Sequence, residues 1–367
     1  MKRIAVMLFF LTLLLYNGRA GADALSAIII EEETGRVLYE SNAHTPLPMA
    51  STTKIMTALI ALEQCDLNEV VTVGPNAFGV PGTSVYLEEG EQLTLEQLLY
   101  GLMLSSGNDA AVAIAEHVSG SVDAFCSLMN ARAQELGCEN TNYVSPHGLP
   151  AENHFTTAYD LAIISRYAMQ NATFRLIVST QRATIPWLSR GYDRVLTNKN
   201  RLLSSYDGAI GIKTGYTKAA GRCLSFAAER DGMTLIGAVL NCPDWFDVSA
   251  QLLDDAFAAY EMKRAFSAGD VIASVEVTNG TEKSVQVVAQ NDVMSPVKRG
   301  EEPNIVISLP QSLPGGFQSG EIIGLIEMTL NGETLASVPI VTQHGVAERT
   351  FLTEFQRNMA QWLLITD

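Results

Sequence analysis

The sequence predicts an α+β protein with two folded domains, followed by an amphipathic helix. Three observations favour this fold class. Strand-like segments stand on both sides of a helix-rich block within residues 25–265, which is typical of helices packed on an antiparallel sheet. Over residues 266–345 the composition changes to short Val/Ile runs separated by turn residues, which predicts a small all-β domain. The 367 residues, 47% of them hydrophobic, also exceed the ~250 residues that one core usually serves.

Residues 1–24 are expected to be an export signal. Lys2 and Arg3 form a basic start, Ile4–Tyr16 is uncharged and apolar, and small residues follow as far as Ala24. A membrane-spanning helix needs ~20 apolar residues, so an uncleaved anchor is the weaker interpretation. We therefore expect a mature chain that begins near residue 25 and works outside the cytoplasm.

Charge and cysteine content exclude several classes of protein. With 24 Lys+Arg against 40 Asp+Glu, the net charge of −16 argues against a nucleic-acid partner, because phosphate binding needs cations. Five scattered cysteines are too few for a disulfide scaffold or a zinc module. Cys223 and Cys242 flank a hairpin expected to turn at Asp231-Gly232, and pairing of Arg230 with Met233 leaves them one diagonal step apart. Diagonal neighbours lie ~7–8 Å apart, so isolated thiols are expected.

The first domain is expected to open with a hairpin over Ser26–Glu31 and Arg36–Glu40, turning through Glu33-Thr34-Gly35. Helices are predicted from Ser51 to about Glu63, over Leu95–Leu104 behind a Thr94/Gln97 capping box, over Asn108–Val118, over Val122–Leu136 behind Ser121, and from Thr157 to Gln170. Strands are predicted at Ala209–Tyr216, Cys223–Glu229 and Met233–Leu240, followed by an amphipathic helix over 248–260.

The second domain carries a strong hairpin signal. Asn331-Gly332 stands between the strand-like segments Glu321–Leu330 and Glu333–Val341, which predicts a two-residue turn. No group of residues in this domain suggests catalysis.

The tail, residues 346–367, is predicted to be an amphipathic helix. One arc of ~120° on its helical wheel holds Phe351, Leu352, Phe355, Met359, Trp362 and Leu363. The helix either lies in a membrane interface or packs on the β domain or a second subunit. Residues 266–367 hold 12 acidic and 5 basic residues, so apolar insertion rather than attraction to anionic lipid would supply membrane affinity.

Three short motifs stand in order along the first domain. Ser51–Lys54 reads Ser-x-x-Lys, Ser106–Asn108 reads Ser-x-Asn, and Lys213–Gly215 reads Lys-Thr-Gly. About one Ser-x-x-Lys is expected by chance in a chain of this length, and a second copy occurs at Ser295–Lys298. In that copy Pro296 argues against a helix. The order of all three motifs, rather than any one of them, indicates function.

The first motif has the spacing that a serine nucleophile and a lysine base require. On a helix, the Ser51 hydroxyl and the Lys54 amine share one face. A helix N-terminus places free N–H groups beside the oxyanion that forms at Ser51. Its dipole and enclosure also disfavour the protonated form of Lys54, as a general base requires. Taken alone, the motif is more often a serine cap followed by a solvated lysine.

With these motifs the chain resembles the serine penicillin-recognising enzymes, and more narrowly the low-molecular-mass penicillin-binding proteins of the serine-type D-alanyl-D-alanine carboxypeptidase family. The stretches that carry the resemblance are Pro48–Thr57, Ser106–Ala110, His147–Leu149, Thr156–Asp160 and Gly211–Thr217. It covers essentially the whole mature chain. It implies a serine DD-peptidase/β-lactamase-like catalytic domain over 25–265, a small β-sandwich-like domain over 266–345 and a membrane-interface helix over 346–367.

The resemblance also implies a reaction. Ser51 would attack the penultimate D-Ala carbonyl of a peptidoglycan stem peptide, Lys54 would take its proton, and Ser106 would relay a proton to the leaving amine. Substrate would be held by Asn108, Lys213, Thr214, Gly215 and Tyr216. β-Lactams would stop at the acyl stage. The implied enzyme uses no cofactor and no metal, and it works at the outer face of the cytoplasmic membrane.

Three other functions stay open at this point. A β-lactamase would need a deacylating Glu in an E-x-x-L-N pattern, which the sequence lacks. A transpeptidase or DD-endopeptidase of the same superfamily shares every motif. A cell-wall-binding protein with a vestigial pocket is the non-catalytic alternative.

Five histidines show no H-E-x-x-H spacing, so metal ligation is not expected, and His147 is placed in a loop near the cleft. Lys199 and Arg201 lie shortly before the Lys-Thr-Gly strand. They either add positive potential to the cleft or form a solvated surface pair.

Overall fold

The computed structural model describes residues 24–187 and 189–351, together with Phe355 and Met359. Its contacts divide the chain into two units, with the division after Ala258. Strand β10 (Tyr260–Phe266) pairs with β13 (Val293–Lys298) and so belongs to the second unit. The boundary predicted at residue 265 falls near the end of β10.

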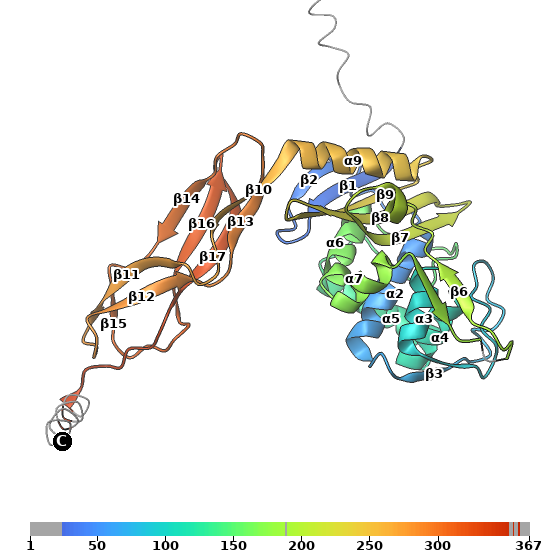
Figure 1. The fold of residues 1–367 in the computed structure, drawn as a ribbon, viewed down its shortest axis with the longest axis horizontal. Coiled ribbons are helices and arrows are strands. Elements are labelled where there is room, and N and C mark those ends of the chain that lie inside the picture. The colour runs from blue at the N-terminus through green and yellow to red at the C-terminus, as the bar shows by residue number, and fades with distance from the viewer. Residues whose placement is uncertain (1–23, 188, 352–354, 356–358, 360–367) are drawn as a thin grey trace, which may run out of the picture. The chain divides into compact units, whose positions relative to one another are not determined.

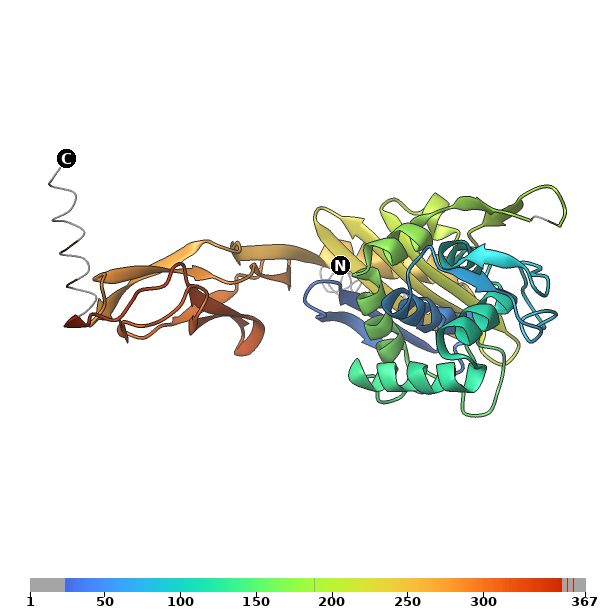
Figure 2. The same cartoon turned by 90° about the horizontal axis from the view of Figure 1, so that it is seen from below.

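The first unit is built on a five-stranded antiparallel sheet in the order β2-β1-β9-β8-β7. The strands are β1 (Ser26–Glu31), β2 (Val37–Ser41), β7 (Ala209–Thr217), β8 (Gly221–Arg230) and β9 (Met233–Leu240). Helix α9 (Trp245–Ala259) lies along one face of the sheet and the other helices cover the opposite face (Figure 1). Figure 2 looks onto those helices from below. Both sheet faces are thus covered, which explains why β9 is apolar along nearly its whole length.

The other predicted helices occur in the predicted order, together with two short helices that were not predicted. They are the 3₁₀ turn η1 (Ala50–Thr53), α2 (Lys54–Gln64), α3 (Leu95–Met103), α4 (Asn108–Ser119), α5 (Val122–Glu135), α6 (Ala158–Met169), α7 (Ala172–Ser179) and α8 (Leu202–Ser205). The Thr94/Gln97 capping box is present, and Ser121 and Thr157 cap α5 and α6 through their hydroxyls. Short elements that the sequence did not predict are α7, α8, β3 (Val70–Thr72), β4 (Gln92–Thr94), β5 (Arg182–Ile185) and β6 (Arg194–Thr197).

The second unit is all β, as predicted. A six-stranded sheet runs β14-β16-β17-β12-β11-β15, and β10 pairs with β13. The further strands are β11 (Val271–Thr278), β12 (Ser284–Ala289), β14 (Asn304–Ser308), β15 (Ser312–Pro314), β16 (Ile322–Leu330) and β17 (Glu333–Thr342). The hairpin at Asn331-Gly332 is confirmed, because both residues have positive φ and Leu330 pairs with Glu333. The second Ser-x-x-Lys copy lies in strand β13, as Pro296 indicated.

The predicted register of the β8–β9 hairpin is also confirmed, since Arg230 pairs with Met233. Cys223 and Cys242 are both buried, and none of the five cysteines, all of which the structure describes, forms a disulfide. Residues 1–23 of the predicted export signal lie outside the described residues.

The tail helix predicted from residue 346 starts later, because Val346 and Glu348 form isolated β-bridges with Phe317 and Gly280 and helical backbone begins at Phe351. Most of the predicted helix beyond that point lies outside the described residues. Phe351, Phe355 and Met359, which the structure does describe, are helical and exposed. Within the described part of the chain, no helix has both the length and the apolar character needed to span a bilayer.

Candidate active site

Ser51 lies in the tight turn η1, so the helical backbone begins one residue earlier than the sequence predicts. Ala50 enters this turn with a φ of 49°, in the left-handed region that a side chain disfavours. Two buried hydroxyls hold the turn: Thr52 Oγ1 donates to Met49 O and Thr53 Oγ1 donates to Ala50 O, each at 2.7 Å. The backbone that carries Ser51 is therefore held by the side chains of its neighbours.

A second layer of contacts supports the turn. His154 Nδ1 accepts the Val144 N–H at 3.1 Å, which leaves Nε2–H to donate to Thr53 Oγ1 at 2.8 Å. Burial, and then the Lys54 charge, lower the pKa of His154 to about 4, so this ring is neutral at neutral pH. Gly148 has a φ of 85° and packs directly on Ala50, since a Cβ there would lie 1.9 Å from Ala50 O.

The Lys54 amine is the centre of the site. Its Nζ lies 3.0 Å from Ser51 Oγ, 2.7 Å from Asn108 Oδ1 and 2.7 Å from His147 O. Asn108 Nδ2 donates to Pro81 O at 2.7 Å. Because a carbonyl oxygen only accepts, this bond fixes the amide so that Oδ1 faces the lysine.

The surroundings favour a neutral Lys54. Burial lowers its pKa well below the ordinary value, and the charges of Lys213 and Lys199 lower it further against an opposing effect of Asp109. A neutral amine has two N–H donors and one lone pair. Both donors are taken up by oxygens that can only accept, on Asn108 and His147. The lone pair is therefore left for the Ser51 hydroxyl, which is the arrangement of a general base beside its nucleophile.

Strand β7 brings the third motif against this turn. Lys213 and Gly215 lie two residues apart and so share one face of the strand. A Cβ on Gly215 would lie 2.9 Å from Ser51 N and 3.0 Å from Met49 O. Since both are backbone atoms that cannot move aside, only glycine permits the strand to approach the nucleophile so closely.

The other residues of this motif differ in their exposure. Lys213 is 1% exposed, and burial followed by the charge of Lys199 lowers its pKa to about 7. Its Nζ donates to Thr214 O at 3.1 Å, and the Thr214 side chain is buried. Tyr216 is exposed, and β7 is the edge strand of its sheet. The outer backbone groups of β7 thus have no partner strand in this sheet.

Ser106 is buried between α3 and α4 and has a φ of 65°. Two residues further on, Asn108 begins α4 and makes the contact with Lys54. Asp109, which the sequence analysis did not single out, binds the loop that contains Ser84 and Val85 to the start of α4. Its carboxylate accepts Ser84 Oγ at 2.6 Å and the Val85 N–H at 3.1 Å.

Lys199 and Arg201, the two cations that precede β7, have different surroundings. Lys199 is exposed, and its charge lowers the pKa of both Lys54 and Lys213, which favours a place beside the cleft. The Arg201 guanidinium instead lies over the Phe246 ring, 5.1 Å from its centroid.

A pocket of about 430 Å³ opens beside Ser105, next to the Ser-x-Asn motif. Its aromatic lining includes Tyr86, Trp187 and Tyr192, and the first two rings stack with centroids 6.4 Å apart. The hollow adjoins the second motif through Ser105, and no residue of the three motifs is part of its lining.

The antiparallel sheet with its helices, and a serine hydroxyl facing a buried lysine amine, define a serine hydrolase of the acyl-enzyme type. Comparison with known proteins gives the family. Residues 17–244 match the family described as D-alanyl-D-alanine carboxypeptidase, and residues 260–348 match the C-terminal domain of penicillin-binding protein 5. The chain belongs to the D-alanyl-D-alanine carboxypeptidase family, and the family predicted from the motifs is confirmed.

Individual relatives are similar to this chain over most of its length. It is 33% identical over 353 residues to the D-alanyl-D-alanine carboxypeptidase DacF of Bacillus subtilis, covering 93% of this chain and 90% of the relative. The crystal structure of penicillin binding protein 5 from Haemophilus influenzae superposes with a TM-score of 0.77 at 30% identity, over 89% of this chain and 98% of that one. The structure of a point mutant of the Streptomyces K15 DD-transpeptidase matches 64% of this chain and 98% of its own length, at 36% identity and a TM-score of 0.61.

Proposed function

We propose that this chain removes the terminal D-alanine from peptidoglycan stem pentapeptides through an acyl-enzyme on Ser51. The observation that carries the proposal is the buried Lys54 amine, 3.0 Å from Ser51 Oγ, with its other two contacts made to acceptor oxygens. That arrangement suits proton removal from the hydroxyl as it attacks a carbonyl.

Acylation begins when Ser51 Oγ attacks the penultimate D-Ala carbonyl and its proton passes to Lys54. The oxyanion is stabilised by the N–H groups of Ser51 and Tyr216. The intermediate collapses, the C–N bond breaks, and Ser106 gives its proton to the departing D-alanine amine. Ser106 then takes up the proton held by Lys54, so that both groups return to their starting states. The second N–H of Asn108 Nδ2 is available for a substrate carbonyl, because Pro81 O occupies only the first.

Substrate binding rests on β7. Its outer edge pairs with the extended peptide in the manner of an added strand. Lys213 and the Thr214 hydroxyl hold the terminal carboxylate, and the nearby Lys199 adds positive potential. These cations explain how a chain of net charge −16 attracts an anionic peptide end.

Water then attacks the ester, releasing the shortened peptide and regenerating Ser51. A β-lactam acylates the same hydroxyl and stays attached, because its leaving group remains part of the adduct. The proposed penicillin binding is therefore a direct consequence of the acylation step.

Transpeptidase and endopeptidase activities share this acyl-enzyme. They are distinguished by offering the purified chain a stem pentapeptide and a cross-linked dimer in parallel. Release of free D-alanine from the pentapeptide is expected to dominate. Cleavage of the dimer without D-alanine release would contradict the proposal.

The value of kcat/KM for the pentapeptide is expected to fall about tenfold per pH unit above pH 7. The reason is that the pKa of Lys213, lowered to about 7, leaves the amine uncharged at higher pH and unable to hold a carboxylate. A lysine is charged below its pKa, so binding is strongest on the acid side. The measurement is D-alanine release at low substrate concentration across the pH range.

Lys213→Arg tests this assignment, because a guanidinium keeps its charge at high pH. The falling limb of the kcat/KM profile is expected to move to higher pH in this variant. A limb that stays in place would assign the titration to another group. The thermal midpoint of the variant serves as the control for folding.

We propose that the helical segment that begins at Phe351 holds the exported enzyme at the outer face of the cytoplasmic membrane. Supporting this, Phe351, Phe355 and Met359 are 88%, 51% and 49% exposed, and their spacing of four residues puts them on one helix face. Deletion of 348–367 is expected to abolish co-sedimentation with liposomes, and neutral and anionic vesicles are expected to bind the intact chain alike. Unchanged sedimentation after the deletion would contradict the assignment.

A further inference from the structure

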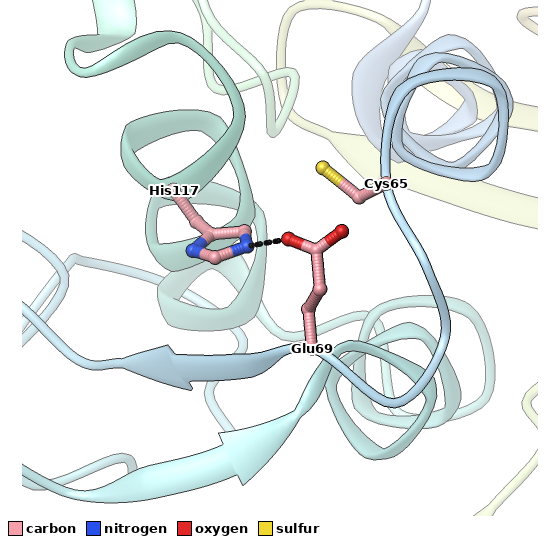
Figure 3. A group of neighbouring side chains, drawn as sticks. All are labelled: Cys65, Glu69 and His117. Atoms are coloured by element: carbon pink, nitrogen blue, oxygen red, sulfur yellow. Dashed lines mark hydrogen bonds and ion pairs between the residues drawn. The ribbon is translucent and has the colours of Figure 1, made fainter.

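Three side chains of different chemistry converge at the surface of the first unit, away from the catalytic turn (Figure 3). Cys65 follows the last residue of α2, Glu69 lies just before β3, and His117 is in the last turn of α4. Their ligand atoms all lie within 4.8 Å of one another, and His117 Nε2 is 3.0 Å from Glu69 Oε2. We infer that this cluster, the Cys65 site, binds a divalent transition metal, with Zn²⁺ the best match.

The ligand types support zinc. A thiolate, an imidazole and a carboxylate are the three side-chain donors that Zn²⁺ accepts, and the thiolate disfavours Mg²⁺ and Ca²⁺. Tetrahedral zinc brings such donors to about 3.3–3.6 Å of each other. The site must therefore close by roughly 1 Å, which rotation of the exposed Glu69 and the half-buried Cys65 side chains provides. Three protein ligands leave the fourth position for water.

The backbone already holds the ligands in place. The Cys65 N–H donates to Ala61 O at 3.1 Å, and Leu95 N–H donates to Glu69 O at 2.9 Å. Glu69 Oε1 accepts the Asp66 N–H at 2.7 Å, which leaves Oε2 facing the histidine. Such a hydrogen bond to the outer oxygen of a ligating carboxylate is a usual feature of metal sites.

An ordinary His–Glu ion pair is the competing explanation. Two such pairs occur elsewhere among the described residues, His44 with Glu40 and His344 with Glu282. Across the described residues, the Cys65 site is the only group of three or more His, Cys, Asp or Glu side chains close enough to hold an ion. The thiol is what distinguishes it from the two pairs, which therefore serve as internal controls.

The metal would act on the helices that carry the catalytic groups. Helix α2 runs from Lys54 to the Cys65 end, and α4 runs from Asn108 to the His117 end. A bound ion would join these helices at the ends remote from the Lys54–Asn108 hydrogen bond. Its role is therefore to stabilise the helix pair, with no part in the reaction.

The test is titration of the full, reduced and metal-free chain with ZnCl₂. One ion per chain is expected to bind in calorimetry, and the thermal midpoint is expected to rise about 5 °C at 100-fold excess over Kd. CoCl₂ is expected to give a thiolate-to-metal charge-transfer band in the near ultraviolet. Cys65→Ser should remove that band and the thermal shift, and His117→Gln should remove the shift.

The matched controls are His344→Gln, which breaks a His–Glu pair without a thiol, and Cys126→Ala, which removes a buried thiol elsewhere. Both are expected to keep the zinc-dependent shift and the cobalt band. Absence of saturable binding, a cobalt complex without the band, or an equal shift in His117→Gln would each overturn the proposal. If Cys65→Ser does not fold, Glu69→Gln at the exposed ligand decides in its place.

Discussion

Replacement of Ser51 by alanine is expected to abolish the covalent penicillin adduct and to lower D-alanine release by at least ~10⁴-fold. The change removes the oxygen that lies 3.0 Å from the Lys54 amine. The fold is expected to be unaffected, because the Thr52 and Thr53 hydroxyls hold the turn. The free energy of unfolding should therefore stay within about 0.5 kcal/mol of the parent value.

Intact-mass measurement after penicillin treatment reads the adduct directly. Ser295→Ala is the matched control, because Ser295 begins the second Ser-x-x-Lys copy and its buried hydroxyl has no hydrogen-bond partner among the described residues. That variant should be acylated like the parent. An adduct that survives Ser51→Ala, or a parent chain that forms none, would contradict the proposed mechanism.

Features of the fold that depend on neighbours in the chain were predictable from the sequence. The Thr94/Gln97 capping box needs only residues three apart, and the Asn331-Gly332 turn needs only two residues that accept positive φ. Pro296 likewise marked the second Ser-x-x-Lys copy as non-helical, and it lies in a strand. The short helix α7, which spans only Ala172–Ser179, was missed because two turns give little periodic signal.

The environment of the candidate base could not be predicted in the same way. The motifs name Lys54 and Asn108, but they do not say that the amide oxygen faces the amine. Two of the groups that determine this arrangement, Pro81 O and His147 O, are backbone carbonyls that any residue could supply. Their contribution follows from how the loops pass the start of α2, which is a property of the tertiary structure.

The Cys65 site likewise could not be predicted from the sequence, because its ligands come from distant parts of the chain. Cys65 and Glu69 lie four residues apart, but His117 follows 48 residues after Glu69, and the sequence analysis expected no metal. They meet because α2 and α4 pack side by side and end near the same point. A site that joins the end of one helix and the following loop to the end of a distant helix gives no short sequence pattern to recognise.

Replacement of Lys54 by methionine is expected to lower the rate of acylation by penicillin and of D-alanine release by about 10²–10⁴-fold. Methionine keeps an unbranched, flexible side chain in the buried site but cannot accept the Ser51 proton. Asn108 Oδ1 and His147 O each lose a donor, and an unsatisfied buried acceptor costs about 1–3 kcal/mol of stability. A measurable drop in the thermal midpoint should therefore accompany the loss of rate.

The pH profile separates a lost base from a disturbed fold. In the parent, the neutral form of Lys54 becomes populated as pH rises through its lowered pKa, so kcat/KM rises with pH over that interval. The residual activity of Lys54→Met should lack this rising limb, whereas a variant that is merely destabilised would keep it. Lys298→Met in the second Ser-x-x-Lys copy is the matched control and should leave rate and profile unchanged. A rising limb that persists in Lys54→Met would show that another group removes the proton from Ser51, because methionine cannot titrate.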